Sequence, residues 1–217
     1  MKLSSRMAKF RGKRKVLEQI RIEGIAAEGK CISRVNDEVL FVEGVAPGDV
    51  VDVLVTRKKK NFMEGKPLKF HSYSEDRIEP FCQHFGVCGG CKWQHIPYDI
   101  QLKYKHQQVI DNLERIGKIP LPEISPILGS SKIKYYRNKL EYTFSNWKWL
   151  TQDEIATGEE LDRRGLGFHV PGSFDKILDI ETCYHQPDPS NEIRLSVRKY
   201  CLENDVPFFD LKRRTGN

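Results

Sequence analysis

The sequence predicts a mainly β protein of the α+β class, in which a small five-stranded barrel of the OB type precedes a small α+β domain. Three observations support this fold. Short alternating apolar segments separated by turns fill residues 16–73, a segment of helical period covers 97–117, and strand patterns followed by a helix occupy 140–204. The 217 residues are enough for one or two domains with cores of their own.

The barrel is expected over residues 16–73. Apolar residues alternate in IRIEGI (20–25) and in VVDVLVTR (50–57), where Val51, Val53 and Val55 share one face. A turn is predicted at 46–49, APGD, because proline presets φ and glycine permits a positive φ. A last strand is expected near 61–71. Residues 1–15 show no hydrophobic period and are predicted to form a flexible basic arm.

Charge is concentrated in the first third of the chain. Residues 1–75 carry 16 Lys and Arg against 10 Asp and Glu, whereas the remaining residues carry 20 of each. This asymmetry indicates an anionic partner, with nucleic acid favoured over a merely solvated basic tail. The loop of Arg57, Lys58, Lys59 and Lys60 is predicted to contact phosphates. Phe62 is either a base-stacking ring or a core aromatic.

Residues 74–217 are expected to form the second domain. A helix at 97–117 begins at a proline and ends at a glycine, and its apolar stripe is formed by Leu102, Val109, Ile110, Leu113 and Ile116. A linker follows at 120–131, and then a strand that includes Leu140, Tyr142 and Phe144. Two strands around a Pro-Gly turn are predicted over 165–180. A last helix at 188–204 carries Ile193, Val197, Tyr200 and Cys201 on one face.

No apolar run is long enough for a membrane helix, and the basic N-terminus has no apolar core behind it. The sequence therefore predicts a cytoplasmic protein without a membrane partner. Thiols stay reduced in that compartment, so a cluster of cysteines is better interpreted as a metal site than as disulfides.

Three of the six cysteines lie in CQHFGVCGGCKWQH, as Cys82, Cys88 and Cys91 with the spacing C-x5-C-x2-C. Gly89 and Gly90 are expected to let the backbone bend so that its N–H groups face the sulfurs. A fourth thiolate must come from elsewhere, and Cys183 is favoured because it follows a strand in a polar loop. Cys31 and Cys201 are interpreted as buried hydrophobic residues.

The spacing leaves the metal open. Zinc and a [4Fe–4S] cluster each commonly use four protein ligands. Three histidines, His84, His95 and His185, lie near the cysteines in sequence, so a Cys3His zinc site is an alternative.

CQHFGVCGGCKWQH, YRNKLEYTFS and CYHQPD together resemble the iron–sulfur class of bacterial 23S rRNA uracil-C5 methyltransferases, and the barrel resembles their TRAM domain. The resemblance implies a structural [4Fe–4S] cluster on Cys82, Cys88, Cys91 and Cys183, and 23S rRNA as the partner. It also implies RNA contacts for Arg137 and Lys139, which alternate along an expected strand and are otherwise ordinary exposed charges.

That family takes its S-adenosylmethionine site and catalytic cysteine from a C-terminal Rossmann-like α/β domain. Gly165-Leu166-Gly167 lacks the rest of a cofactor loop, so we expect the methyltransferase domain to be absent, no catalytic residue in this chain, and no activity of the chain alone. S-adenosylmethionine would then bind only the full-length protein, and helix 97–117 would pack on the missing domain.

Two alternatives remain. One is a stand-alone RNA-binding protein with a TRAM domain and a zinc site. The other is a fragment of a radical-type methylthiotransferase, although the cysteine spacing and the domain order both disagree with that class.

Overall fold

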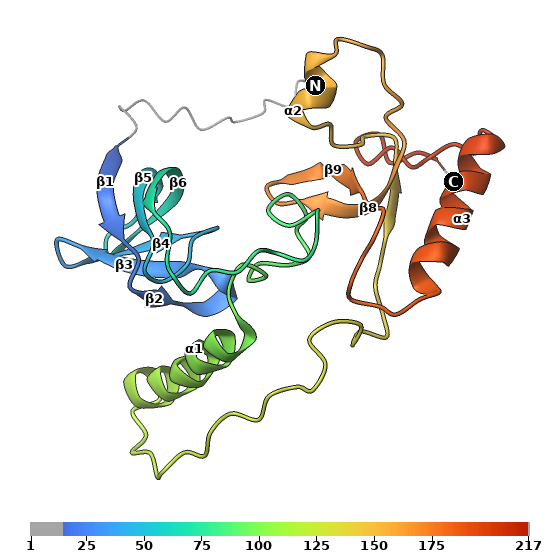
Figure 1. Ribbon diagram of the computed structural model, residues 1–217. Helices are drawn as coiled ribbons and strands as arrows, with labels where there is room; N and C mark the ends of the chain where they lie inside the picture. Colours follow the sequence, from blue (N-terminus) through green and yellow to red (C-terminus); the bar gives the residue numbers. More distant parts are fainter. Residues whose placement is uncertain (1–14, 217) are drawn as a thin grey trace, which may run out of the picture. The chain divides into compact units, whose positions relative to one another are not determined.

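The computed structural model describes residues 15–216, which form two compact units (Figure 1). The first unit ends at Arg77 and the second begins at Ile78. The first thus extends slightly beyond the predicted 73, because Ser74 and Arg77 both bond to Asp49 inside it. The predicted basic arm lies almost wholly outside the described residues.

The first unit is a sheet with strand order β1-β5-β6-β4-β3-β2. Its strands are β1 (Val16–Arg21), β2 (Gly24–Ile25), β3 (Cys31–Val35), β4 (Glu38–Val42), β5 (Val50–Lys58) and β6 (Phe62–Ser72), with a 3-10 turn η1 (Ala27–Gly29). Strands β4 and β6 pair in parallel, and the other pairs are antiparallel. No pairing of β1 with β2 is found within residues 15–216, so a closed barrel is not confirmed.

The sheet has six strands, where five were predicted. The predicted strand at 20–25 is divided between β1 and β2 at Ile22. The N–H of Ile22 donates to Asp49 O and its carbonyl accepts from Gly48 N–H, both at 2.8 Å, so Ile22 pairs with a turn rather than a strand. Of the three valines predicted to share one face, Val51 and Val53 are fully buried, whereas Val55 is only half-buried.

The predicted turn at 46–49 is confirmed. Gly48 has a φ of +95°, and Asp49 N–H donates to Ala46 O at 3.1 Å. The fully buried carboxylate of Asp49 accepts from Ala46 N–H at 2.6 Å and from Arg77 Nη2 at 2.7 Å. This turn therefore connects the middle of the first unit to its last residue.

The second unit contains a three-stranded antiparallel sheet with the order β7-β8-β9. Its elements are α1 (Tyr98–Asp111), a π-helical turn η2 (Asn112–Ile116), β7 (Thr143–Ser145), α2 (Gln152–Ala156), β8 (Gly165–Val170), β9 (Ser173–Asp179) and α3 (Ser190–Glu203). The predicted hairpin over 165–180 is confirmed, and Gly172 in its turn has a φ of +76°. The strand predicted from Leu140 is reduced to β7.

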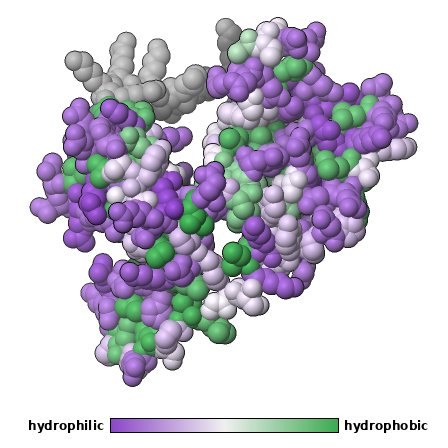
Figure 2. Space-filling model, viewed as in Figure 1, coloured by the Kyte–Doolittle hydropathy of each residue, from purple (hydrophilic) through white to green (hydrophobic). Residues whose placement is uncertain are grey.

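Helix α1 and the turn η2 that continues it leave part of the predicted apolar stripe at the surface. The exposed fraction is 51% for Val109 and 78% for Ile116. Figure 2 shows hydrophobic side chains among hydrophilic ones over this helix, at the lower left. Among the described residues no helix has the length and hydrophobicity needed to cross a membrane.

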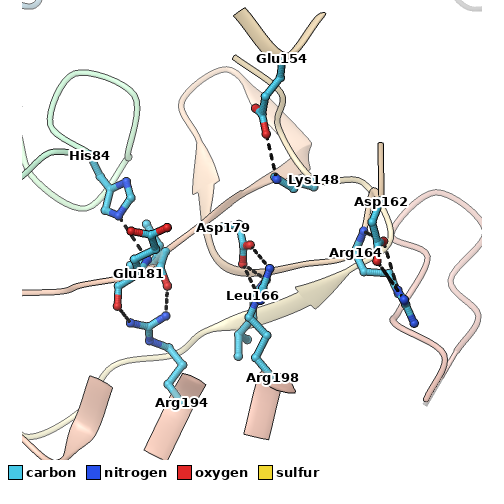
Figure 3. Close-up of polar contacts among 11 residues, drawn as sticks. His84, Lys148, Glu154, Asp162, Arg164, Leu166, Asp179, Glu181, Arg194 and Arg198 are labelled. Atoms are coloured by element: carbon cyan, nitrogen blue, oxygen red, sulfur yellow. Dashed lines mark hydrogen bonds and ion pairs between the residues drawn. The ribbon is translucent and has the colours of Figure 1, made fainter. Parts of the chain in front are cut away.

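Helix α3 turns its predicted apolar face toward the solvent instead of burying it. Ile193 is 60% and Tyr200 is 63% exposed, whereas Arg194 is only 5% exposed. The buried face is polar because its arginines find partners at the end of β9. Arg194 donates to the carbonyls of Ile180 and Glu181, and Arg198 donates to the Asp179 carboxylate (Figure 3).

Candidate functional site

Cys82, Cys88 and Cys91 lie in a loop without helix or strand in the second unit. The loop is built from short-range bonds: Cys88 N–H donates to His84 O at 2.9 Å, and Cys82 N–H donates to the side chain of Gln94 at 3.2 Å. Gly90 N–H lies 3.3 Å from Cys88 Sγ. The predicted contact between a backbone N–H group and a sulfur is therefore present.

Gly89 is required for space rather than for its backbone angles. Neither Gly89 nor Gly90 has a positive φ, so the expected conformational reason is wrong. A Cβ at Gly89 would lie 2.8 Å from His169 O in β8, closer than packed atoms approach, whereas at Gly90 it would meet only Cys88 Sγ at 3.4 Å. Gly89 thus allows the loop that holds Cys82, Cys88 and Cys91, called the thiol loop below, to lie against β8.

Cys183 approaches the same loop from the segment that follows β9. Its side chain is buried with Val170, Leu178 and Ile180, and Cys88 packs against this group. Two contacts connect the loop to the residues just before Cys183. Glu181 N–H donates to His84 Nε2 at 3.3 Å (Figure 3), and Gln83 donates to the Glu181 carboxylate at 3.2 Å.

Two of the four predicted cysteines, Cys88 and Cys91, have thiols with a raised pKa. Burial raises the pKa of the Cys88 thiol to about 11, and the neighbouring Cys82, Cys91 and Cys183 contribute to the rise. Burial likewise raises the pKa of Cys91, with contributions from Cys82 and Cys183. The thiols of Cys88 and Cys91 are therefore protonated near neutral pH, and a metal would have to displace these protons to bind.

This donor set is chemically suited to a thiolate-bound metal centre, but the structure does not confirm one. Within residues 15–216, no three side chains of His, Cys, Asp or Glu are close enough to hold a single metal ion. All six cysteines are free thiols. Both the [4Fe–4S] cluster and the zinc alternative stay predictions.

The histidines and the other two cysteines differ in their positions. His185 Nε2 lies 3.2 Å from Cys91 Sγ, so the ring of this histidine contacts the sulfur of a predicted ligand directly. His95 is buried against Phe85, with ring centroids 5.2 Å apart. Cys31 is buried in the first unit, where its thiol donates to Val45 O at 3.0 Å, as expected of a core residue. Cys201 is partly buried on α3.

Asn191 on α3 was missed in the sequence. Its side-chain oxygen accepts from Cys183 N–H at 2.9 Å, and its amide donates to Cys183 O at 3.2 Å. A polar residue at the start of a predicted helix was the only available signal. The sequence could not show which backbone groups that residue would bind.

The predicted basic loop is not wholly a loop, because Arg57 and Lys58 end β5. Lys59 and Lys60 lie in the turn before β6, which is closed by Lys59 N–H donating to Phe62 O at 2.8 Å. Arg57 lies 3.5 Å from the Glu64 carboxylate, and Lys58 lies 2.9 Å from that of Glu38. Lys59 and Lys60 are exposed.

The ring of Phe62 is half-buried and meets Phe41 edge-on at 5.7 Å. Part of the Phe62 ring therefore packs in the fold, as a core aromatic would, whereas its base-stacking role stays a prediction.

Arg137 and Lys139 do not alternate along a strand, because residues 132–142 have no regular structure. This segment instead follows the residues after Cys183, since Tyr135 N–H donates to Tyr184 O and Arg137 N–H donates to His185 O. Lys139 is paired with Glu141 at 2.7 Å, whereas Arg137 is exposed at the rim of a groove.

Comparison with known proteins finds that residues 14–68 match the TRAM domain family. An uncharacterized RNA methyltransferase of Bacteroides thetaiotaomicron is 57% identical over 88% of this chain and 42% of its own length. A counterpart of Porphyromonas gingivalis is 52% identical over 90% of this chain and 43% of its own length. The chain is thus similar to RNA methyltransferases and spans about two fifths of the curated relatives that it matches.

Among solved structures, the fold resembles a tRNA (uracil-54, C5)-methyltransferase of Pyrococcus abyssi in complex with S-adenosyl-L-homocysteine. The TM-score is 0.54 at 24% identity, over 92% of this chain and 40% of that one. The expectation that this chain lacks the cofactor domain and is inactive alone is not supported by this match, which covers 40% of the other chain and shows a likeness of fold alone.

Proposed function

We propose that this chain recognises RNA within an S-adenosylmethionine-dependent methyltransferase that methylates C5 of a uridine in 23S rRNA. The observation that carries the proposal is the TRAM match over residues 14–68 in a chain similar to RNA methyltransferases over most of its length. The first 75 residues contain 16 basic and 10 acidic side chains, and this net positive charge agrees with an RNA partner. Lys59, Lys60 and the accessible part of Phe62 supply the phosphate contacts and a stacking surface.

The four cysteines of the second unit would hold a [4Fe–4S] cluster in this proposal. When bound, the cluster supplies a covalent connection between the loop of Cys82, Cys88 and Cys91 and the segment of Cys183. The chain's own contribution is to position these ligands: Asn191 holds the backbone of Cys183, and Gly90 N–H faces Cys88 Sγ. Reduced thiols of this kind suit a cytoplasmic protein.

Two further candidates each rest on one observation. The likeness to the Pyrococcus abyssi tRNA (uracil-54, C5)-methyltransferase favours a uridine of tRNA as the target. The contact of 3.2 Å between Cys91 Sγ and His185 Nε2 favours an RNA-binding protein with a zinc site instead of a cluster.

The test is a methyl-transfer assay with the complete protein as it is encoded, using labelled S-adenosylmethionine and separate 23S rRNA and tRNA transcripts. The proposal expects 5-methyluridine at one mapped position of 23S rRNA. Product in tRNA alone would reject the ribosomal target. RNA binding without product on either substrate would favour the stand-alone binding protein, and no RNA binding at low salt would reject all three.

A further inference from the structure

A groove of about 640 Å³ lies in the second unit, and its lining residues are distinct from the loop of Cys82, Cys88 and Cys91. One wall is the segment from Arg137 to Phe144, and the other is the first two turns of α3 with the loop before it. The volume is in the range of pockets that hold small organic ligands. No role has so far been given to most of its lining residues.

The groove has an apolar interior. The ring of Phe144 is held edge-on against Phe208, with centroids 5.0 Å apart, so it presents a fixed surface. Ile193 and Val197 of α3 line the opposite wall, and they are 60% and 46% exposed. Rings and branched side chains of this kind suit the flat, apolar faces of a nucleobase.

Arg194, which also lines the groove, is a buried cation without a carboxylate partner. It is 5% exposed, donates to two backbone carbonyls and to Asn191 Oδ1, and its guanidinium lies 5.1 Å from the centre of the Tyr142 ring, so that all these partners are uncharged. No ion pair to Arg194 is formed by any residue from 15 to 216, and its buried Nε has no hydrogen-bond partner there. One turn further along α3, Arg198 does have such a partner in Asp179. Buried charges are normally paired, so this arginine favours an anionic ligand.

The rim agrees with that assignment. Arg137 is exposed and can reach an entering anion, and Asn138 beside it offers both a donor and an acceptor to a base edge. Asp188 is the acidic residue of the lining, and its carboxylate accepts from Asn191 at 3.4 Å. An apolar protein segment laid in this groove would leave two guanidinium groups without an anion, whereas a nucleotide would satisfy the apolar and the cationic parts together.

We propose that this groove binds one unstacked nucleotide of RNA, with its base between Phe144 and the Ile193–Val197 wall and its phosphate toward Arg137 and Arg194. The inference rests on the proposed function, because it takes RNA to be the substrate. It adds a second place of RNA contact, in a different unit from the TRAM domain.

The probe is a single-stranded oligouridylate that contains 4-thiouridine, bound to the full chain near 0.15 M salt, where long-range charge effects are screened beyond about 8 Å. We expect photo-crosslinks within residues 137–144 or 190–197. Val197→Asp and Arg137→Gln are each expected to weaken binding about fivefold or more, since a phosphate contact or a good base contact is removed. Ser196→Asp places the same new charge on an exposed neighbouring position of α3 and is expected to change affinity less than about twofold.

Three results would overturn the inference. RNA binding with crosslinks confined to the first unit, and with unchanged affinity of Val197→Asp, rejects the groove and leaves the proposed function intact. Equal losses for Val197→Asp and Ser196→Asp also reject it, because the effect would then be charge alone. Failure of the unmodified chain to bind RNA rejects the proposed function and the groove together.

Discussion

Asn191 holds Cys183 by both of its backbone groups, at 2.9 Å to the N–H and 3.2 Å to the carbonyl. Arg194 Nη2 donates to the same Asn191 oxygen at 3.0 Å, and both residues belong to α3. The position of α3 therefore determines the position of the predicted fourth ligand. This explains why the buried face of α3 is polar, since it serves backbone groups rather than a hydrophobic core.

Replacing Asn191 with alanine is expected to lower the free energy of unfolding by about 1–3 kcal/mol, because two backbone groups of a buried residue lose their partners. Urea denaturation of the purified chain measures this change. Ser196→Ala is the matched control on an exposed position of α3, and it is expected to stay within about 0.5 kcal/mol of the unmodified chain. Equal stability of the two variants would contradict the role given to Asn191.

Gly89→Ala is expected to destabilise the protein by about 1–3 kcal/mol, because the added methyl group would lie against His169 O and force the thiol loop away from β8. Gly90→Ala makes the same chemical change one residue later, where the new atom has ordinary contact distance to Cys88 Sγ. Thermal denaturation of both variants separates packing from backbone freedom. A larger loss for Gly90→Ala than for Gly89→Ala would show that the steric explanation is wrong.

Local patterns in the sequence predicted the elements whose causes are local. The hairpin of β8 and β9 follows from alternation around Pro171-Gly172, and α1 follows from helical period between a proline and a glycine. The short helix α2 also has a local signal that was overlooked, the reciprocal bonds between Thr151 and Glu154 at its start.

Other features depend on contacts that no local pattern contains. The strand at 20–25 is divided because Ile22 pairs with the turn at Gly48 and Asp49. The orientation of α3 depends on backbone carbonyl groups just after β9. Because every residue has a carbonyl group, the sequence does not indicate which ones Arg194 would bind. The approach of Cys183 to the thiol loop was anticipated from residue types, whereas Asn191, which holds it there, was not.

Asp49 is expected to make the first unit sensitive to acid. Burial alone would raise its pKa, but hydrogen bonds from Arg77, Ala46 and Ser74 and the charge of Arg77 outweigh burial and hold the pKa below its usual value. A lowered folded-state pKa means that the stabilisation is fully present above the unfolded value of about 3.9 and is lost as the pH falls through the folded value. The unfolding free energy is therefore expected to drop below about pH 4.

Asp49→Asn tests this assignment. It leaves Arg77 without its carboxylate and is expected to reduce stability near pH 7 by about 3 kcal/mol, the lower end for a broken buried pair, since Arg77 is partly exposed. The variant should also lose less stability on acidification than the unmodified chain. Asp37→Asn, at an exposed turn position, is the control. An unchanged acid slope in Asp49→Asn would exclude Asp49 as the responsible group.

Cys183→Ser is expected to lower the iron content of anaerobically purified protein and its absorbance near 400 nm, because one of the four proposed cluster ligands is removed. Cys201→Ser is the control, since that thiol lies on α3 and is not among those that raise the pKa values of Cys88 and Cys91. Zinc retained by Cys183→Ser at the level of the unmodified protein would instead favour the site with His185.

The basic loop contains one lysine that is ion-paired within the described part of the fold and two that are not. Lys58 is paired with Glu38, whereas Lys59 and Lys60 form no ion pair with any residue in the described range. Replacing both Lys59 and Lys60 with glutamine is expected to make the slope of log affinity against log salt shallower by about 1.4, if each contacts one phosphate of single-stranded RNA.

Lys58→Gln is expected to change that slope by much less than Lys60→Gln, because Glu38 already compensates the charge of Lys58. The substitution would leave the Glu38 carboxylate without its partner. Fluorescence anisotropy at several salt concentrations measures both slopes on the same RNA. If the two single variants change the slope equally, the local ion pair does not control the contact. The loop would then act only through its total charge.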